Sequence, residues 1–168
     1  MSTITYTLYG LNPFFGLELD EGAREVVFEV SLMAVDGSVV LQCLDVDTGQ
    51  DYISITEDCT VTIVLKGNQL YFSEALEGIM TNQELSSYYG GLVYKDYDAS
   101  VGRYKSVQFK ARYNEGGKVG TTHSFDINVE LLNVVKGMGA MITSGNLSIT
   151  PDIKNPPPID DCPMGDIG

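Results

Sequence analysis

The residues with the clearest spacing for chemistry form one short acidic loop, residues 45–51 (DVDTGQD). Carboxylates at alternate positions, with a glycine that bends the chain, are how proteins gather several oxygen ligands for Ca²⁺ over a short span. Asp45, Asp47 and Asp51 are therefore candidate calcium ligands. The loop departs from a complete EF-hand, because Gly49 stands at its fifth position rather than its sixth. A plain turn rich in Asp and Gly is the alternative, and the sequence indicates no other cofactor.

Side chains that commonly act as catalysts are few. The chain has one histidine, His123, and three scattered cysteines without a C-x-x-C pair. His123 shares its predicted strand face with Phe125, Ile127 and Val129, so we expect it in the core, hydrogen-bonded to a carbonyl group. An enzyme would have to draw its acid and base from scattered carboxylates. We therefore predict that the protein is not an enzyme.

A basic, tyrosine-rich segment is the second feature with functional content. Residues 95–118 contain six of the ten Lys and Arg residues and three acids, so the segment carries +3 and the remainder −16. Tyr and Arg are enriched at protein interfaces because they bury area and keep a polar group. The candidate partner-binding residues are Tyr94, Tyr97, Arg103, Tyr104, Lys110 and Arg112. The alternative is cross-strand pairing, in which Asp126 and Glu130 neutralise Lys110 and Arg112.

Net charge and composition argue against two classes of binding partner. The 168 residues carry a net charge of −13, with 23 acidic against 10 basic side chains. This excess of acid argues against binding to nucleic acid or to an anionic membrane. The sequence shows neither a secretory leader nor an apolar run of roughly 18 residues. We expect a cytoplasmic protein.

Alternating apolar and polar residues indicate strands along most of the chain. The predicted strands are 4–8, 26–34, 38–46, 52–55, 59–65, 69–72, 107–113 and 125–131, with a further strand pattern in the remaining segments. Asp36-Gly37 is a typical hairpin turn, and Asn114-Glu115-Gly116-Gly117 is predicted to join residues 107–113 to 125–131 as a second hairpin. The fold class is therefore all-β, an antiparallel β-sandwich of about nine strands.

Two segments depart from the strand pattern. Thr81-Asn82-Gln83-Glu84 matches a capping box and Gly90-Gly91 a helix stop, which predicts one short helix near residues 82–89. Three consecutive prolines, Pro156 to Pro158, cannot join a ladder. We expect a single β-sandwich domain over residues 1–151 and an extended or flexible C-terminal tail over residues 152–168.

These observations predict a non-enzymatic, acidic module that binds a protein or associates with itself. Its partner would be another copy of the chain, in a homo-oligomer, or an acidic protein, bound through the Tyr- and Lys/Arg-rich segment 88–113. The alternative is a β-sandwich that binds Ca²⁺, a small ligand or a carbohydrate through the Asp45–Asp51 loop.

Overall fold

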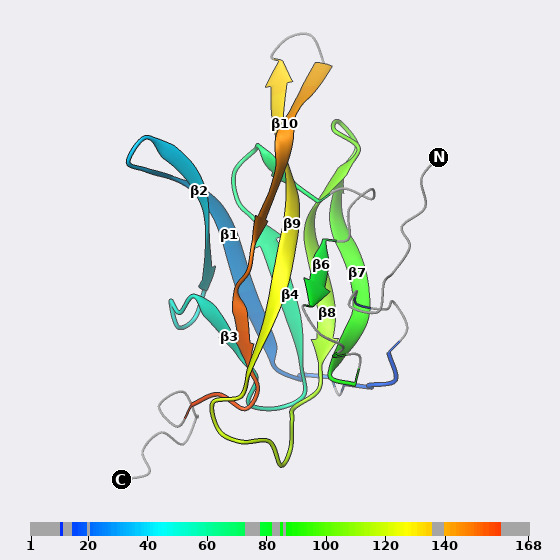
Figure 1. The fold of residues 1–168 in the computed structure, drawn as a ribbon. Helices are drawn as coiled ribbons and strands as arrows, with labels where there is room; N and C mark the ends of the chain where they lie inside the picture. Colours follow the sequence, from blue (N-terminus) through cyan, green and yellow to red (C-terminus); the bar gives the residue numbers. More distant parts are fainter. Residues whose placement is uncertain are drawn as a thin grey trace.

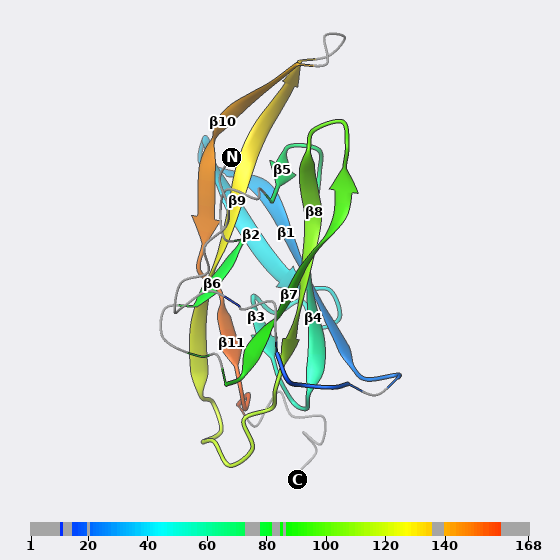
Figure 2. The ribbon, with the colours of Figure 1, turned by 90° about the vertical axis from the view of Figure 1, so that its right-hand side faces the viewer.

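The structure is a computed structural model, and it describes residues 11, 15–19, 21–72, 78–81, 85, 87–135 and 140–158. These residues form eleven strands in two sheets that face each other as a sandwich (Figures 1 and 2). None of the described residues is helical. None of them forms a helix long and apolar enough to cross a membrane. The predicted all-β sandwich is confirmed.

The first sheet has the strand order β2-β1-β4-β8-β7. Its strands are β1 (Glu25–Val35), β2 (Ser38–Asp45), β4 (Cys59–Leu65), β7 (Tyr89–Asp98) and β8 (Arg103–Ala111). The hairpin between β1 and β2 turns at Asp36 and Gly37, which both have positive φ angles, 50° and 81°. A Gly at this position tolerates the left-handed backbone that a two-residue hairpin turn needs, so the predicted hairpin is confirmed.

The second sheet is built around the long strand β9. Its strands are β3 (Tyr52–Ser54), β5 (Leu70–Tyr71), β6 (Ile79–Thr81), β9 (Thr122–Val135), β10 (Ala140–Ile149) and β11 (Asp152–Lys154). Their main order is β10-β9-β11-β3, and β5 and β6 also pair with β9. Figure 2 shows β9, β10 and β11 in one layer and β4, β7 and β8 in the other.

The sheets are mixed rather than purely antiparallel. β1 pairs with β4 in parallel, and so does β3 with β11. A parallel pair needs a long connection, and here the chain leaves the first sheet after β2, forms β3 in the second sheet and returns as β4. Alternation of apolar residues indicates which face is buried but carries no information about strand direction. The predicted antiparallel pairing is corrected in this respect.

The predicted hairpin between residues 107–113 and 125–131 is wrong. β8 pairs with β4 on one side and β7 on the other, whereas β9 lies in the opposite sheet. The connection over residues 112–121 crosses between the sheets, which pack about 10 Å apart in sandwiches. Phe109 and Phe125 are buried in the core as expected, but they enter it from opposite sheets.

The core fills the space between the two layers. Its fully buried members include Phe28, Val61, Ile63, Phe72, Phe109, Phe125, Ile127 and Ile153. β4 shows the origin of this core most clearly, since its burial alternates at every residue from Cys59 to Leu65. Both described cysteines, Cys43 and Cys59, are free and buried in the core, where a thiol behaves as a small apolar group.

Two further predictions concern segments that the structure describes only in part. Of the predicted helix near 82–89, residues 82–84 and 86 lie outside the described residues, while 87 and 88 form a turn and Tyr89 begins β7. The predicted strand 4–8 also lies outside them. Of the predicted tail, Asp152–Lys154 forms β11 between β9 and β3, and Asn155 to Pro157 are buried. These residues therefore belong to the folded body.

Candidate functional site

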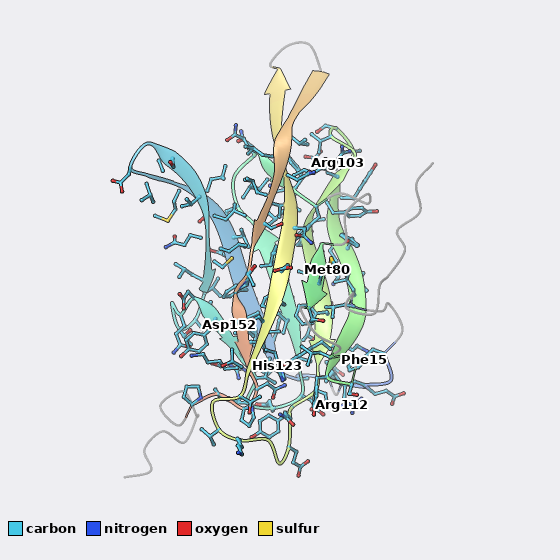
Figure 3. All side chains as sticks on the ribbon, in the orientation of Figure 1. Phe15, Met80, Arg103, Arg112, His123 and Asp152 are labelled. Carbon is cyan, nitrogen blue, oxygen red and sulfur yellow. The ribbon has the colours of Figure 1, made fainter. Side chains whose placement is uncertain are left out.

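A cavity of about 540 Å³ opens at the end of the sandwich where β8 finishes and β4 and β7 begin. Three connections supply its walls: the one before β4, the turn before β7, and the one after β8. We call it the Tyr88–Arg112 cavity. Its lining consists of Thr56, Glu57, Asp58, Tyr88, Arg112, Tyr113, Asn114 and Glu115. Figure 3 shows Arg112, Phe15 and His123 at this end and Arg103 at the opposite end.

The Tyr88 ring is supported from inside the protein by His123. The two rings are stacked, with centroids 5.7 Å apart and planes at 29°. Tyr88 is half-buried and lines the cavity, whereas His123 is buried behind it. A ring fixed on one face by another ring presents its remaining surface with little freedom to rotate away.

A buried hydrogen-bond network holds His123 in turn. The Tyr89 hydroxyl lies 2.6 Å from His123 Nδ1 and accepts a bond of 3.1 Å from Asn155 Nδ2. The hydroxyl donates to Nδ1 when the imidazole proton is on Nε2, and it accepts from Nδ1–H in the other tautomer. Burial lowers the pKa of His123 and raises that of Tyr89, so both groups are neutral near pH 7.

Asn155 connects this network to the cavity wall. Its side chain accepts a 2.8 Å bond from the Asn114 backbone N–H and donates a 2.9 Å bond to the Arg112 carbonyl. Its own carbonyl accepts from the Asn114 side chain at 3.1 Å. Asn155 is completely buried, and every polar atom of its side chain is used. The segment after β8 is therefore held at a defined position against the end of β11.

Among the described residues of the lining, Arg112 carries the only positive charge. Its Nε donates to the Ser87 carbonyl at 3.2 Å, and its guanidinium lies over the Phe15 ring, 5.3 Å from the centroid. Among the described residues, the ion pairs are Lys66–Glu29 and Arg103–Glu130. Arg112 thus pairs with no described carboxylate, although three carboxylates line the same cavity. Its terminal nitrogens are available for a planar anionic group.

Of the three carboxylates, Asp58 is the one whose position is fixed by a hydrogen bond. Its Oδ1 accepts a 2.8 Å bond from the backbone N–H of Tyr113. All three carboxylates, Asp58 included, belong to exposed residues of the lining. The cavity therefore combines two aromatic rings, one guanidinium and three carboxylates, from segments that are far apart in the sequence.

Two other cavities are less suited to a ligand with both rings and anionic groups. One, of about 600 Å³, runs along β2, β3 and the link from β10 to β11, and Asp51 and Asp152 line it without a Lys or Arg. The other, of about 450 Å³, contains Glu18, Glu21, Glu57 and Asp58, and its described lining has no basic or aromatic residue. Buried thiols are also poor nucleophiles here, because burial raises the pKa values of Cys43 and Cys59 to about 12.

The predicted calcium loop forms a turn between β2 and β3. Asp45 is buried, and its Oδ1 accepts bonds from the backbone N–H groups of Asp47 (2.8 Å) and Thr48 (3.2 Å). These bonds are those of a side chain that stabilises its own turn. Across the part of the chain that the structure describes, no group of three or more His, Cys, Asp or Glu residues could hold a metal ion.

Five of the six predicted partner-binding residues lie on β7 and β8, and the sixth, Arg112, follows β8 directly. Tyr94, Tyr97 and Tyr104 pack as a row of rings on the β7–β8 hairpin, with centroids 5.4 Å and 4.9 Å apart. Arg103 pairs with Glu130 at 2.7 Å, and Lys110 donates to the Leu17 carbonyl at 2.9 Å. Arg112 alone lines the Tyr88–Arg112 cavity. The predicted pairing of Lys110 and Arg112 with Asp126 and Glu130 is absent from the described residues, because β8 and β9 lie in different sheets.

Comparison with known proteins identifies the family. A family model described as "pNTSase1: Predicted novel nucleotide synthetase" matches residues 1–158. The chain belongs to this family. The match covers every described residue, β11 and the three prolines included. No curated protein matches the sequence significantly.

Membership of the pNTSase1 family corrects the prediction of function. The description is that of an enzyme, so the predicted non-enzymatic module that binds protein or associates with itself, and its Ca²⁺- or carbohydrate-binding alternative, are wrong. The sequence contains no short local motif of catalytic residues from which an enzyme could be predicted. The lining of the cavity instead comes from residues 56–58, 88 and 112–115, and none of these segments has a recognisable catalytic pattern alone.

Sequence reasoning found Arg112 but missed Asp58, Tyr88 and Tyr113 as site residues. Tyr88 and Tyr89 could have drawn attention, since two adjacent aromatic residues at the start of a strand place one ring inward and one outward. Tyr89 is indeed buried and Tyr88 faces the cavity. No sequence signal links Asp58 to Tyr113, because their contact spans 55 positions.

Proposed function

We propose that this chain is an enzyme of nucleotide synthesis and that its nucleotide substrate binds in the Tyr88–Arg112 cavity. The match of the pNTSase1 family to residues 1–158 carries the proposal. The cavity supports it, because it combines the groups that a nucleotide needs: flat rings for the base and a cation for the phosphate. Its volume of about 540 Å³ lies within the range of small-molecule sites.

The base would stack on the tyrosine rings. Base–aromatic stacking contributes about 1–3 kcal/mol per base, and Tyr88 is already backed by His123 at 5.7 Å. A ring that is held in place before the ligand arrives loses little entropy on binding. The network of Tyr89, His123 and Asn155 therefore acts as a positioning group beneath the base.

Arg112 would bind the phosphate. A guanidinium presents paired N–H groups that match two phosphate oxygens, and the Nε bond to Ser87 and the Phe15 ring hold this one in place. Carboxylates of the lining can accept a proton from the group that attacks the nucleotide. A cavity that holds the nucleotide and the attacking group together makes their reaction effectively unimolecular. This proximity is a large part of the rate enhancement when two molecules are joined.

Binding and turnover test the proposal directly. The purified protein is titrated calorimetrically with each of the four common ribonucleoside triphosphates in the presence of Mg²⁺. After each titration the solution is analysed by mass spectrometry for new nucleotide products. We expect saturable binding and a product in the wild type. Tyr88→Ala and Arg112→Gln should each weaken binding by about tenfold or more, since each removes about 1–3 kcal/mol of stacking or charged hydrogen bonding.

Lys95→Gln is the matched control. Lys95 is an exposed cation on β7, opposite Ser106 and outside the cavity lining. Its loss changes the net charge by the same amount as Arg112→Gln and should leave nucleotide affinity unchanged. Binding that is unaffected by Tyr88→Ala and Arg112→Gln would place the nucleotide elsewhere, and a wild type that binds no nucleotide would refute the proposal.

A further inference from the structure

The hydrogen-bonding character of the Tyr88–Arg112 cavity points to one kind of base. We propose that its nucleotide is a guanine nucleotide and that Asp58 reads the Watson–Crick edge of the guanine. This inference rests on the function proposed above and names its substrate class. It follows from which lining groups are already committed to the protein and which remain available to a ligand.

Some polar groups of the lining are already bonded within the protein. The Asn114 side chain donates to the Asn155 carbonyl at 3.1 Å. The Thr56 hydroxyl oxygen accepts a bond from Arg24, and its own O–H remains a donor. Arg112 retains its terminal nitrogens, as described above. Besides this cation and three side-chain hydroxyls, the described lining offers three strong acceptors, the carboxylates of Glu57, Asp58 and Glu115. An ionised carboxylate accepts hydrogen bonds and donates none.

Asp58 is the carboxylate with a defined orientation. The N–H that fixes its Oδ1 belongs to Tyr113, whose ring lines the same cavity, so the ring and the carboxylate are positioned as one unit. Its second oxygen, Oδ2, has no partner among the described residues. A base lying against this wall would therefore present its edge to an acceptor.

The four bases differ in what they present to a carboxylate. Guanine carries two adjacent donors, N1–H and the N2 amino group, on its Watson–Crick edge, and a carboxylate can accept both. Adenine and cytosine place an acceptor nitrogen beside their amino group, and uracil flanks its single N–H with two carbonyl oxygens. In each of these a lone pair faces the carboxylate, which is repulsive. Pockets that hold a free base commonly read this edge.

The positions of the charged groups in the cavity agree with a nucleotide whose base edge faces Asp58. Arg112 forms no ion pair with Glu57, Asp58 or Glu115, so cation and carboxylates lie more than 4.0 Å apart. A ligand that satisfies both must be anionic at one end and a donor at the other. A guanine nucleotide has this distribution, with its phosphate suited to Arg112 and its base edge suited to Asp58.

Calorimetric titration with nucleoside monophosphates tests the assignment. GMP, IMP, AMP, CMP and UMP are compared on the wild type, on Asp58→Asn and on Glu115→Gln. We expect the wild type to bind GMP about tenfold or more tightly than AMP, the size of one good bidentate contact. IMP, which lacks the N2 amino group, should fall between them.

The two variants distinguish the loss of a specific contact to the base from the loss of one negative charge in the cavity. Asp58→Asn keeps an oxygen for the Tyr113 N–H but replaces Oδ2 with a donor, so the preference for GMP over AMP should fall by about tenfold. Glu115→Gln removes the same charge from the same cavity and should change the affinities for GMP and AMP by equal factors.

The possible outcomes distinguish the guanine assignment from the proposed nucleotide site itself. Equal binding of GMP, IMP and AMP by the wild type, or a preference that survives Asp58→Asn, would overturn the guanine assignment while leaving the nucleotide site intact. A wild type that binds none of the five would refute the proposed function and this inference together. The comparison of IMP with GMP uses the wild type alone, so it decides the point even if a variant does not fold.

Discussion

His123 is the residue on which the geometry of the cavity depends most. It is the only histidine in the chain. One of its faces stacks on Tyr88, and its Nδ1 is hydrogen-bonded to the Tyr89 hydroxyl. Protonation would place a positive charge on a buried ring, and burial disfavours the charged form. The neutral imidazole is therefore the form that the fold requires, and this has a measurable consequence.

We predict that acid destabilises the protein through this histidine. Burial lowers the His123 pKa in the folded state below the ordinary value of about 6.5 that it has in the unfolded chain. The unfolded state then binds more protons below that pH, so the stabilisation is complete above about pH 6.5 and is lost as the pH falls through the lowered folded pKa. The NMR titration of the single imidazole should give a midpoint below 6.5.

The control for this effect is His123→Gln. Carboxylates also titrate in acid, so the free energy of unfolding is measured by urea denaturation between pH 7.5 and pH 5 in both proteins. The wild type should lose more stability over this interval than the variant. A folded-state imidazole midpoint at or above 6.5, or identical pH profiles, would show that His123 does not need to be neutral.

At the scale of the elements, β11 is the segment whose role differs most from expectation. It lies between β9 and β3, and Ile153 and Asn155 are almost fully buried. The prolines that follow cannot donate to a ladder, yet Pro156 and Pro157 are buried, and the Pro156 carbonyl accepts a bond from Gly120 N–H at 3.0 Å. Residues 152–158 thus complete one sheet, and Asn155 supports the cavity wall from behind through Arg112 and Asn114.

We predict that residues 152–158 are required for folding. A chain that ends at Pro151 loses β11, the buried Ile153 and all bonds of Asn155, and a single buried aliphatic side chain already accounts for about 2–5 kcal/mol. Such a loss approaches the whole stability of a typical domain, about 5–15 kcal/mol. The shortened chain should lack a cooperative thermal transition by circular dichroism.

A chain that ends at Pro158 is the matched control. It keeps every contact described for β11 and Asn155, and it spans the residues that the family model matches. We expect its melting temperature to stay within a few degrees of that of the full chain. Should the chain that ends at Pro151 melt cooperatively near the same temperature, β11 would be dispensable.

At the scale of the whole molecule, the two sheets are joined by more than their apolar core. Arg103 of β8 and Glu130 of β9 form a bond of 2.7 Å between Nε and Oε1 that spans the layers at the end opposite the cavity. The side chains are 28% and 11% exposed, so water screens the pair only in part. Residues predicted to face a partner are here used to join the protein to itself.

We predict that Glu130→Ala destabilises the fold by about 1–3 kcal/mol, because it leaves the half-buried Arg103 guanidinium without its acceptor. Replacement of both residues, Arg103→Met with Glu130→Leu, should recover part of the loss, since no unpaired charge remains. Urea unfolding of the wild type, of Arg103→Met and Glu130→Leu singly, and of the double variant gives the coupling energy. A coupling energy near zero would mean that the pair contributes nothing to the stability of the sandwich.

Much of the fold could be read from the sequence, and the reason is periodicity. Alternation in β4 and β9 gives the buried face of each strand directly, and Asp36-Gly37 gives the turn between β1 and β2. Strand partners could not be read in this way. Residues 107–113 and 125–131 alternate equally well as a hairpin and as members of opposite sheets, and the structure puts them in opposite sheets.

The residues of the candidate site could not be predicted from the sequence for a related reason. A linear pattern records neighbours along the chain, whereas the Tyr113–Asp58 and Tyr89–Asn155 bonds join positions 55 and 66 residues apart. The sequence by itself determined the all-β class, the buried face of most strands and one basic residue of the site, Arg112. Only the tertiary structure decided which layer each strand joins. It thereby also decided which tyrosines, carboxylates and amide meet around the cavity, because long-range packing and not local preference brings these segments together.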